Sequence, residues 1–151
     1  MTKQNVPYWV KKGLCLYVSV VFVQSLFFKF TGAPETVHIF GILAQWSGIG
    51  LFASIGAYSV GLVELLASCL LWTKFRLFGA IMAVGTMSGA VFFHLFTPLG
   101  IYMPEFDAEG IIIGNDGGLL FINACMVLSA AVAIALMEYR GSGNHCRSEK
   151  N

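Results

Sequence analysis

One apolar stretch, residues 57–73, carries an acidic residue near its centre. Its sequence, AYSVGLVELLASCLLWT, is close to the length that an α-helix needs to cross a hydrocarbon core of about 30 Å at about 1.5 Å per residue. At the depth of Glu64, an ionisable side chain costs about 2.5–3.5 kcal/mol to insert. Any fold of this chain therefore has to provide Glu64 with a partner or a water-filled cavity, and the partner's identity is the functional question.

The composition places the rest of the chain in a membrane as well. Of the 151 residues only 11% are charged, whereas a soluble domain has about 25% charged residues. The length fits one domain. Basic residues are not interleaved with aromatic ones in any cluster, which argues against nucleic-acid binding. The cysteines stand apart without a CxxC pair, so neither a zinc site nor a dithiol redox motif is indicated.

The distribution of apolar residues, prolines and glycines predicts an all-α integral membrane protein, a bundle of four transmembrane helices. The expected spans are residues 13–30, 57–73, 75–97 and 118–139. A short amphipathic segment that begins at Pro34 is expected at the interface between the first two spans, because proline suits the first position of a helix. The conformations of residues 34–56 and 98–117 stay open. Residues 48–56 either extend the second span outward or form a re-entrant turn, and Pro104 excludes a continuous helix in the later connection.

Basic residues gather on one side of this four-span arrangement, and only Lys29 falls near the other side. The side in question holds Lys3, Lys11, Lys12, Lys74, Arg76, Arg140, Arg147 and Lys150. Short loops rich in Lys and Arg stay in the cytoplasm. We therefore expect a multi-pass protein of the plasma (inner) membrane, with residues 1–12 and the polar, frayed tail 140–151 in the cytoplasm. The acidic connection 98–117 then faces outward.

Four ionisable residues are expected to converge in the outer half of the bundle. Helix geometry places Glu64 about 10 Å and His94 about 5 Å below the outer surface, with Lys29 and Asp116 near that surface. Glu64 and His94 each share a helix stripe with small residues, which let another helix approach closely. Lys29, Glu64, His94 and Asp116 are therefore the candidate catalytic residues.

Each of these residues also has a purely structural explanation. Lys29 can extend to the interface, His94 can hydrogen-bond a carbonyl at a helix end, and Asp116 can cap the fourth helix. Glu64 has no such architectural duty, which favours a functional role. Metal binding by Glu64, His94 and His38 is conceivable, but their spacing matches no compact ligand motif and no metal site is predicted.

Four short motifs, in order, resemble those of the DoxX-like family of small four-helix membrane proteins. They lie between residues 27 and 121 and read FFKFTGAPE, VGLVELLASCLL, GAVFFHLF, and LGI with NDGGLLF. The resemblance places Lys29, Glu64, His94 and Asp116 on the family's characteristic polar positions. It implies a membrane subunit of a redox or detoxification complex, or an assembly chaperone for another membrane protein. The stretch IYMPEFDAEGIIIGN makes one connection longer than the family pattern.

Two functions remain open. The first is a subunit of a quinone-linked oxidoreductase that holds a quinone or another hydrophobic substrate near Glu64. The sequence has no haem, flavin, iron–sulfur or nucleotide motif, so a separate subunit would carry the electron chemistry, and whether this chain is itself an enzyme stays open. The second is a non-catalytic scaffold or chaperone that holds a partner helix in grooves lined by Gly61, Gly79, Ala83, Gly85 and Gly89.

Further alternatives are weaker. Four short spans without an internal repeat disfavour a transporter or channel. In either favoured function the expected partners are the lipid bilayer and a protein partner or a second copy of the chain.

Overall fold

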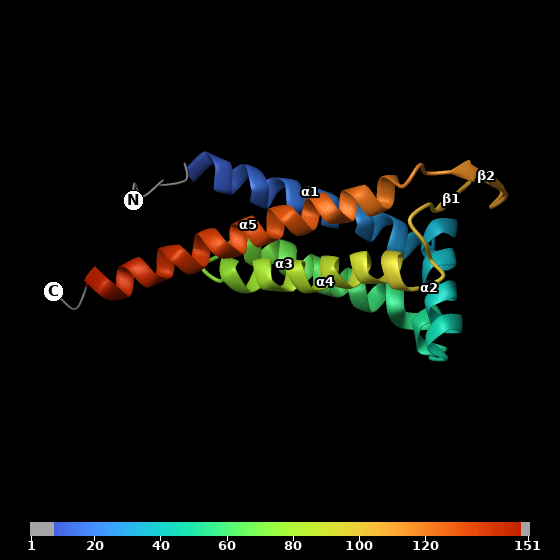
Figure 1. Cartoon of the computed structure of the whole chain (residues 1–151), viewed down its shortest axis with the longest axis horizontal. Helices are drawn as coiled ribbons and strands as arrows, with labels where there is room; N and C mark the ends of the chain where they lie inside the picture. The colour runs from blue at the N-terminus through green and yellow to red at the C-terminus, as the bar shows by residue number, and fades with distance from the viewer. Residues whose placement is uncertain (1–7, 149–151) are drawn as a thin grey trace.

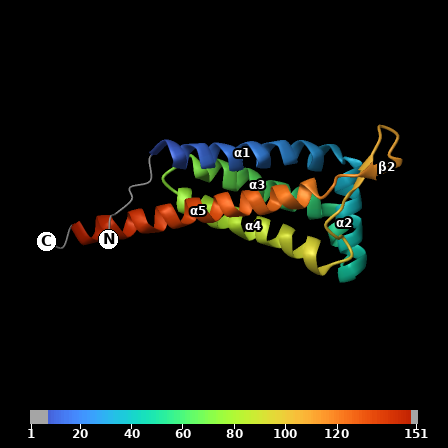
Figure 2. The same cartoon turned by 45° about the horizontal axis from the view of Figure 1, so that its top comes forward.

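The computed structural model describes the backbone of residues 8–148 and the side chains of residues 8–140. Its helices are α1 (Tyr8–Thr31), α2 (Pro34–Ser47), the π-helical turn η1 (Phe52–Gly56), α3 (Ala57–Leu71), α4 (Arg76–Phe96) and α5 (Leu119–Ser148). Two short strands, β1 (Pro104–Phe106) and β2 (Ile112–Asn115), lie between α4 and α5. α1, α3, α4 and α5 run side by side as a bundle, and α2 lies across one end of it (Figures 1 and 2).

Within the described part of the chain, four helices are long and apolar enough to cross a membrane, as the sequence predicted. The candidate spans are Tyr8–Thr31, Phe52–Leu71, Arg76–Phe96 and Leu119–Arg140, and at most 33% of any span is buried inside the protein. Large apolar side chains therefore cover the outside of the bundle, such as Leu62 and Leu66 on α3. Such a surface is stable against acyl chains and not against water. The prediction of four helices that are long and apolar enough to span a membrane is confirmed.

The helix boundaries differ from the expected ones in three places. α1 begins at Tyr8 and thus includes Lys11 and Lys12. The second span begins at Phe52, because η1 continues directly into α3, so residues 52–56 extend that span outward and form no re-entrant turn. α5 runs on to Ser148, well past the expected end at residue 139, so the tail is helical over this part.

Helix α2 forms where Pro34 predicted a helix start. Pro34 occupies its first turn, and Gly48, with φ of +70°, ends it in the left-handed conformation. Phe40 and Leu43 are buried on the face of α2 that packs against the end of the bundle. A Cβ atom at Gly56 would lie 2.6 Å from the ring of Phe40, so the close approach of α2 to η1 needs a glycine there.

The connection after α4 folds into an antiparallel hairpin that the sequence did not predict. Pro104 of β1 pairs with Asn115 of β2, and the register shifts between Glu105 and Phe106. The ring centroid of Phe106 lies 5.8 Å from that of His38 on α2, so the hairpin packs against α2. We call the end of the bundle that carries α2 and the hairpin the outer end, and the opposite end, where α1 begins, the inner end (Figure 1).

Helices α3 and α4 are close at the inner end and diverge toward the outer end. A Cβ atom at Gly79 would lie 2.8 Å from the carbonyl oxygen of Ala67, so the two backbones nearly touch there. At Gly85 and Gly89, further along α4, a Cβ atom would meet nothing within 4 Å. Figure 2 shows α4 leaving the other helices in the direction of α2. This divergence leaves room between the helices in the outer half of the bundle.

Candidate ligand-binding cavity

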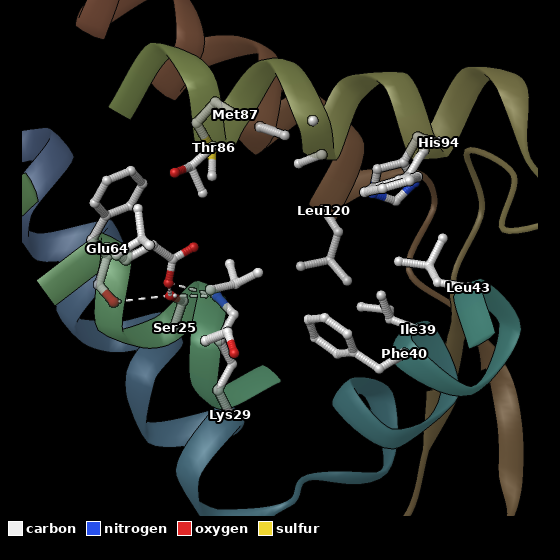
Figure 3. A pocket seen from close by; sticks show the side chains of 18 of the residues that line it. Ser25, Lys29, Ile39, Phe40, Leu43, Glu64, Thr86, Met87, His94 and Leu120 are labelled. Carbon is white, nitrogen blue, oxygen red and sulfur yellow. Dashed lines mark hydrogen bonds and ion pairs between the residues drawn. The ribbon is translucent and has the colours of Figure 1, made fainter. Parts of the chain in front are cut away.

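A cavity of about 460 Å³ occupies the space that the diverging helices leave. Side chains from α1, α2, η1, α3, α4 and α5 line it, and most of them are apolar (Figure 3). Its polar lining residues are Ser25, Lys29, Ser59, Glu64, Thr86, His94 and Asn123. Three of the four residues predicted from the sequence therefore face one cavity, namely Lys29, Glu64 and His94.

Lys29 is the partner of Glu64. Its Nζ lies 2.6 Å from Oε2 of Glu64, and Ser25 Oγ donates to the same oxygen at 2.6 Å. Lys29 Nζ also donates to Ser25 Oγ at 3.0 Å, as their i, i+4 spacing on α1 allows. The side chains of Lys29 and Glu64 are only 13% and 3% exposed, so Lys29 turns inward to the pair rather than outward to water.

A glycine one turn before Glu64 brings the two helices together. A Cβ atom at Gly61 would lie 3.2 Å from the side chain of Leu26 on α1, so even an alanine there would require the Leu26 side chain to shift slightly. Gly61, Glu64 and Ser68 are all buried along one stripe of α3, as the helical spacing predicted. The hydroxyl of Ser68 is buried without a hydrogen-bond partner among the described residues. The short contact between α1 and α3 thus places the carboxylate of Glu64 within reach of Lys29.

His94 lies on the opposite side of the cavity from this ion pair (Figure 3). Its Nδ1 is 2.6 Å from the carbonyl oxygen of Gly100, just beyond the end of α4, and its ring meets that of Phe121 edge-on at 5.7 Å. The carbonyl contact at a helix end is the structural role that the sequence left open for His94. The residue is buried, and its ring still forms part of the cavity wall.

Asp116 does not line the cavity. Its Oδ1 accepts hydrogen bonds from the backbone N–H groups of Met103 and Gly118, and its Oδ2 accepts one from Leu120 in the first turn of α5, each at 2.9 Å. Burial raises the pKa of Asp116, but the combined effect of these three hydrogen bonds lowers it by more than burial raises it. The pKa of Asp116 therefore lies below its usual value. Asp116 therefore caps the N-terminus of α5 and links it to Met103. The prediction that four residues cluster is thus correct for Lys29, Glu64 and His94, which line the cavity, and wrong for Asp116, which lies outside it.

Other lining residues had little or no signal in the sequence. Phe40 and Leu43 reach the cavity from α2, whose position across the bundle depends on tertiary contacts. Asn123 lies on α5, where Tyr17 donates to its Oδ1 at 3.2 Å. In the sequence, Asn123 is detectable as an amide within the apolar run 119–137.

A second ionic cluster lies at the inner end, far from the cavity. Glu138 Oε1 accepts from Lys11 Nζ at 2.9 Å and from Arg76 Nη1 at 3.1 Å. Arg76 Nε also donates to the carbonyl oxygen of Leu71 at 2.7 Å. Glu138 was not predicted from the sequence as a contact residue, and its two partners join α1 and the start of α4 to α5.

The described residues give no support to the other sites considered. No three His, Cys, Asp or Glu residues gather within residues 8–140, and His38 lies against Phe106 rather than near Glu64. The small residues expected to form a groove for a partner helix serve different purposes. Gly61 and Gly79 contact helices of the same chain, whereas Gly85 and Gly89 border the cavity.

Comparisons with known proteins found no matching family model, no matching curated protein and no matching solved structure. The resemblance to DoxX-like proteins therefore depends on the short motifs alone. The function has to be inferred from the chemistry of the cavity.

Proposed function

We propose that this chain is a DoxX-like membrane subunit of a quinone-linked redox complex, and that it binds the quinone head group in the cavity of the outer half. The observation that carries the proposal is the cavity itself, with a buried Lys29–Glu64 pair on one wall and His94 on the other. Its volume of about 460 Å³ lies in the range of small-molecule sites, roughly 300–1,000 Å³.

The lining chemistry suits an apolar ring with oxygen atoms at its two ends. Phe22, Phe40 and Phe93 provide apolar surface for a ring. Lys29 and His94 place hydrogen-bonding groups on opposite walls. A ligand that is apolar throughout would leave the remaining N–H of Lys29 and the Nε2 of His94 unpaired, and a strongly polar one would lose its hydration against the apolar walls.

The cavity also lies where a lipid-borne ligand can enter. Ser59 and Val63 on α3 and Gly85 on α4 line the cavity and are exposed on the surface of the bundle. This exposed border belongs to the membrane-spanning part of both helices, so the opening faces acyl chains. A quinone dissolved in the bilayer reaches the cavity through it, with its isoprenoid tail left in the lipid.

The remaining parts of the proposal follow from charge and from the motifs. Lys11, Lys12, Lys74 and Arg76 lie near the inner end, which makes that end cytoplasmic in a plasma membrane and leaves α2 at the outer interface. A partner subunit supplies the electron chemistry. The alternative function, a scaffold for a partner helix, is less favoured because Gly61 and Gly79 are already occupied by contacts within the chain.

Photolabelling with an azidoquinone tests this function on the purified protein in lipid nanodiscs. We expect the label on peptides of α3 and α4 that border the cavity, and competition by decylubiquinone. Gly89→Leu fills the cavity and should abolish labelling, whereas Gly13→Leu, at a helix position with equally open surroundings but outside the cavity, should not affect it. Equal labelling of both variants would refute the proposal. In membranes, Glu64→Gln should lower quinone-linked reduction.

A further inference from the structure

We infer that the cavity prefers the reduced ligand, a hydroquinone with two hydroxyl groups, over the oxidised quinone. This inference rests on the proposed function and specifies which form of the ligand the site takes. It follows from the hydrogen-bonding groups that Glu64 and His94 leave unused on the two walls of the cavity.

Glu64 offers one free acceptor. Lys29 and Ser25 both donate to its Oε2, and no described residue donates to its Oε1. Figure 3 shows this second oxygen directed away from Lys29, toward the side of the cavity where Thr86 lies. The hydroxyl of Thr86 donates to the carbonyl oxygen of Met82 at 3.0 Å, so its proton is already used. Oε1 is therefore free to accept a hydrogen bond from a ligand in the cavity.

His94 offers a second acceptor on the opposite wall. The carbonyl oxygen of Gly100 can only accept, so the 2.6 Å contact requires the proton on Nδ1 of His94. In the neutral imidazole, Nε2 then carries a lone pair. No described residue donates to this nitrogen, and the ring lines the cavity.

The two forms of the ligand meet these acceptors differently. A hydroxyl group donates one hydrogen bond and also accepts, so it can pair with Glu64 or His94 while accepting from the remaining N–H groups of Lys29 or Asn123. A carbonyl oxygen only accepts. A bound quinone therefore leaves both Oε1 of Glu64 and Nε2 of His94 without a donor. Each such loss in a dry site weakens binding by about tenfold or more.

The test compares decylubiquinol with decylubiquinone, each binding to the purified full chain in nanodiscs without oxygen. We expect the quinol to bind at least about tenfold more tightly than the quinone. His94→Asn places an amide nitrogen near the position of Nδ1, which preserves the bond to Gly100 and removes the acceptor at Nε2. It should weaken quinol binding by about tenfold and leave quinone binding nearly unchanged.

Glu64→Gln provides an independent variant if His94→Asn fails to fold. Its amide oxygen can replace Oε2 toward Lys29 and Ser25, and its NH₂ group then points into the cavity as a donor. The preference should shift toward the quinone. Equal affinities in the unmodified protein, or tighter binding of the quinone, would overturn the inference but leave the proposed function intact. Binding of neither form would refute both.

Discussion

Lys29→Met should destabilise the protein more than Glu64→Gln, although both substitutions break the same ion pair. Glu64 is deeply buried, with a side chain that is 3% exposed, and without Lys29 its carboxylate retains Ser25 as its donor among the described residues. Lys29, by contrast, lies two residues before the end of α1 and has a flexible stem that can turn to water at the interface. Without Lys29, the buried carboxylate of Glu64 cannot turn to water in this way.

The size of the effect follows from the burial of the pair. Removing one partner of a buried ion pair costs about 3–5 kcal/mol. Because the side chain of Glu64 is only 3% exposed, we expect Lys29→Met to lower the free energy of unfolding by about 3–5 kcal/mol.

Glu64→Gln should cost about 1 kcal/mol, because the amide still accepts from Ser25 and Lys29 can extend to the interface. The double variant Lys29→Met with Glu64→Gln should be more stable than Lys29→Met alone by about 2 kcal/mol, since it no longer buries an unpaired charge. Equilibrium unfolding in mixed micelles of increasing SDS content measures these differences. Tryptophan fluorescence is a suitable signal, because Trp72, directly after α3, donates to Ser19 on α1 at 3.0 Å and this contact is lost on unfolding.

Two results would refute this reasoning. The first is a double variant less stable than Lys29→Met alone. The second is a greater loss from Glu64→Gln than from Lys29→Met.

The other predictions concern the helix contacts and the two structural acids. Gly79→Ala should lower stability by about 1–3 kcal/mol in the same assay, because its Cβ would lie 2.8 Å from a backbone oxygen of α3, whereas Gly85→Ala, in open surroundings, should be neutral or slightly stabilising. Asp116→Ala should cost about 1–2 kcal/mol and speed hydrogen exchange at the amides of Met103 and Leu120. Since the pKa of Asp116 is lower in the folded protein, the intact chain should keep this contribution above the ordinary value of 3.8 and lose it only as the pH falls through the lowered pKa. Glu138→Gln should cost less than about 1 kcal/mol, and high salt should remove the difference, because its ion pairs with Lys11 and Arg76 are partly exposed.

The positions of the spans were predictable because the cost of placing polar groups in lipid is a local property of each segment. The start of α2 at Pro34 was predictable for a similar reason, since proline fixes the backbone at that residue alone. The stripe of Gly61, Glu64 and Ser68 followed from helical spacing, and so did the proximity of Ser25 to Lys29. These features depend on residues within a few positions of one another.

The detailed site was less predictable. Depth along the helix axis placed Lys29, Glu64, His94 and Asp116 at similar levels, but it contained no information about which way each side chain turns. In the structure Lys29 turns to Glu64, His94 binds Gly100 across the cavity, and Asp116 turns away to cap α5. The hairpin of β1 and β2 was missed because its pairing joins residues on either side of a turn in a connection without a clear apolar period.

The sequence by itself determined which segments are long and apolar enough to cross a membrane, and that a buried acid needs a partner. Only the tertiary structure decided that a cavity exists and which side chains face it. The physical reason is that the cavity depends on how α3 and α4 diverge, and the contacts of Gly79 with Ala67 and of Gly56 with Phe40 set that geometry between residues distant in the chain. Local hydropathy and helical periodicity describe neighbouring residues only and therefore do not predict such contacts.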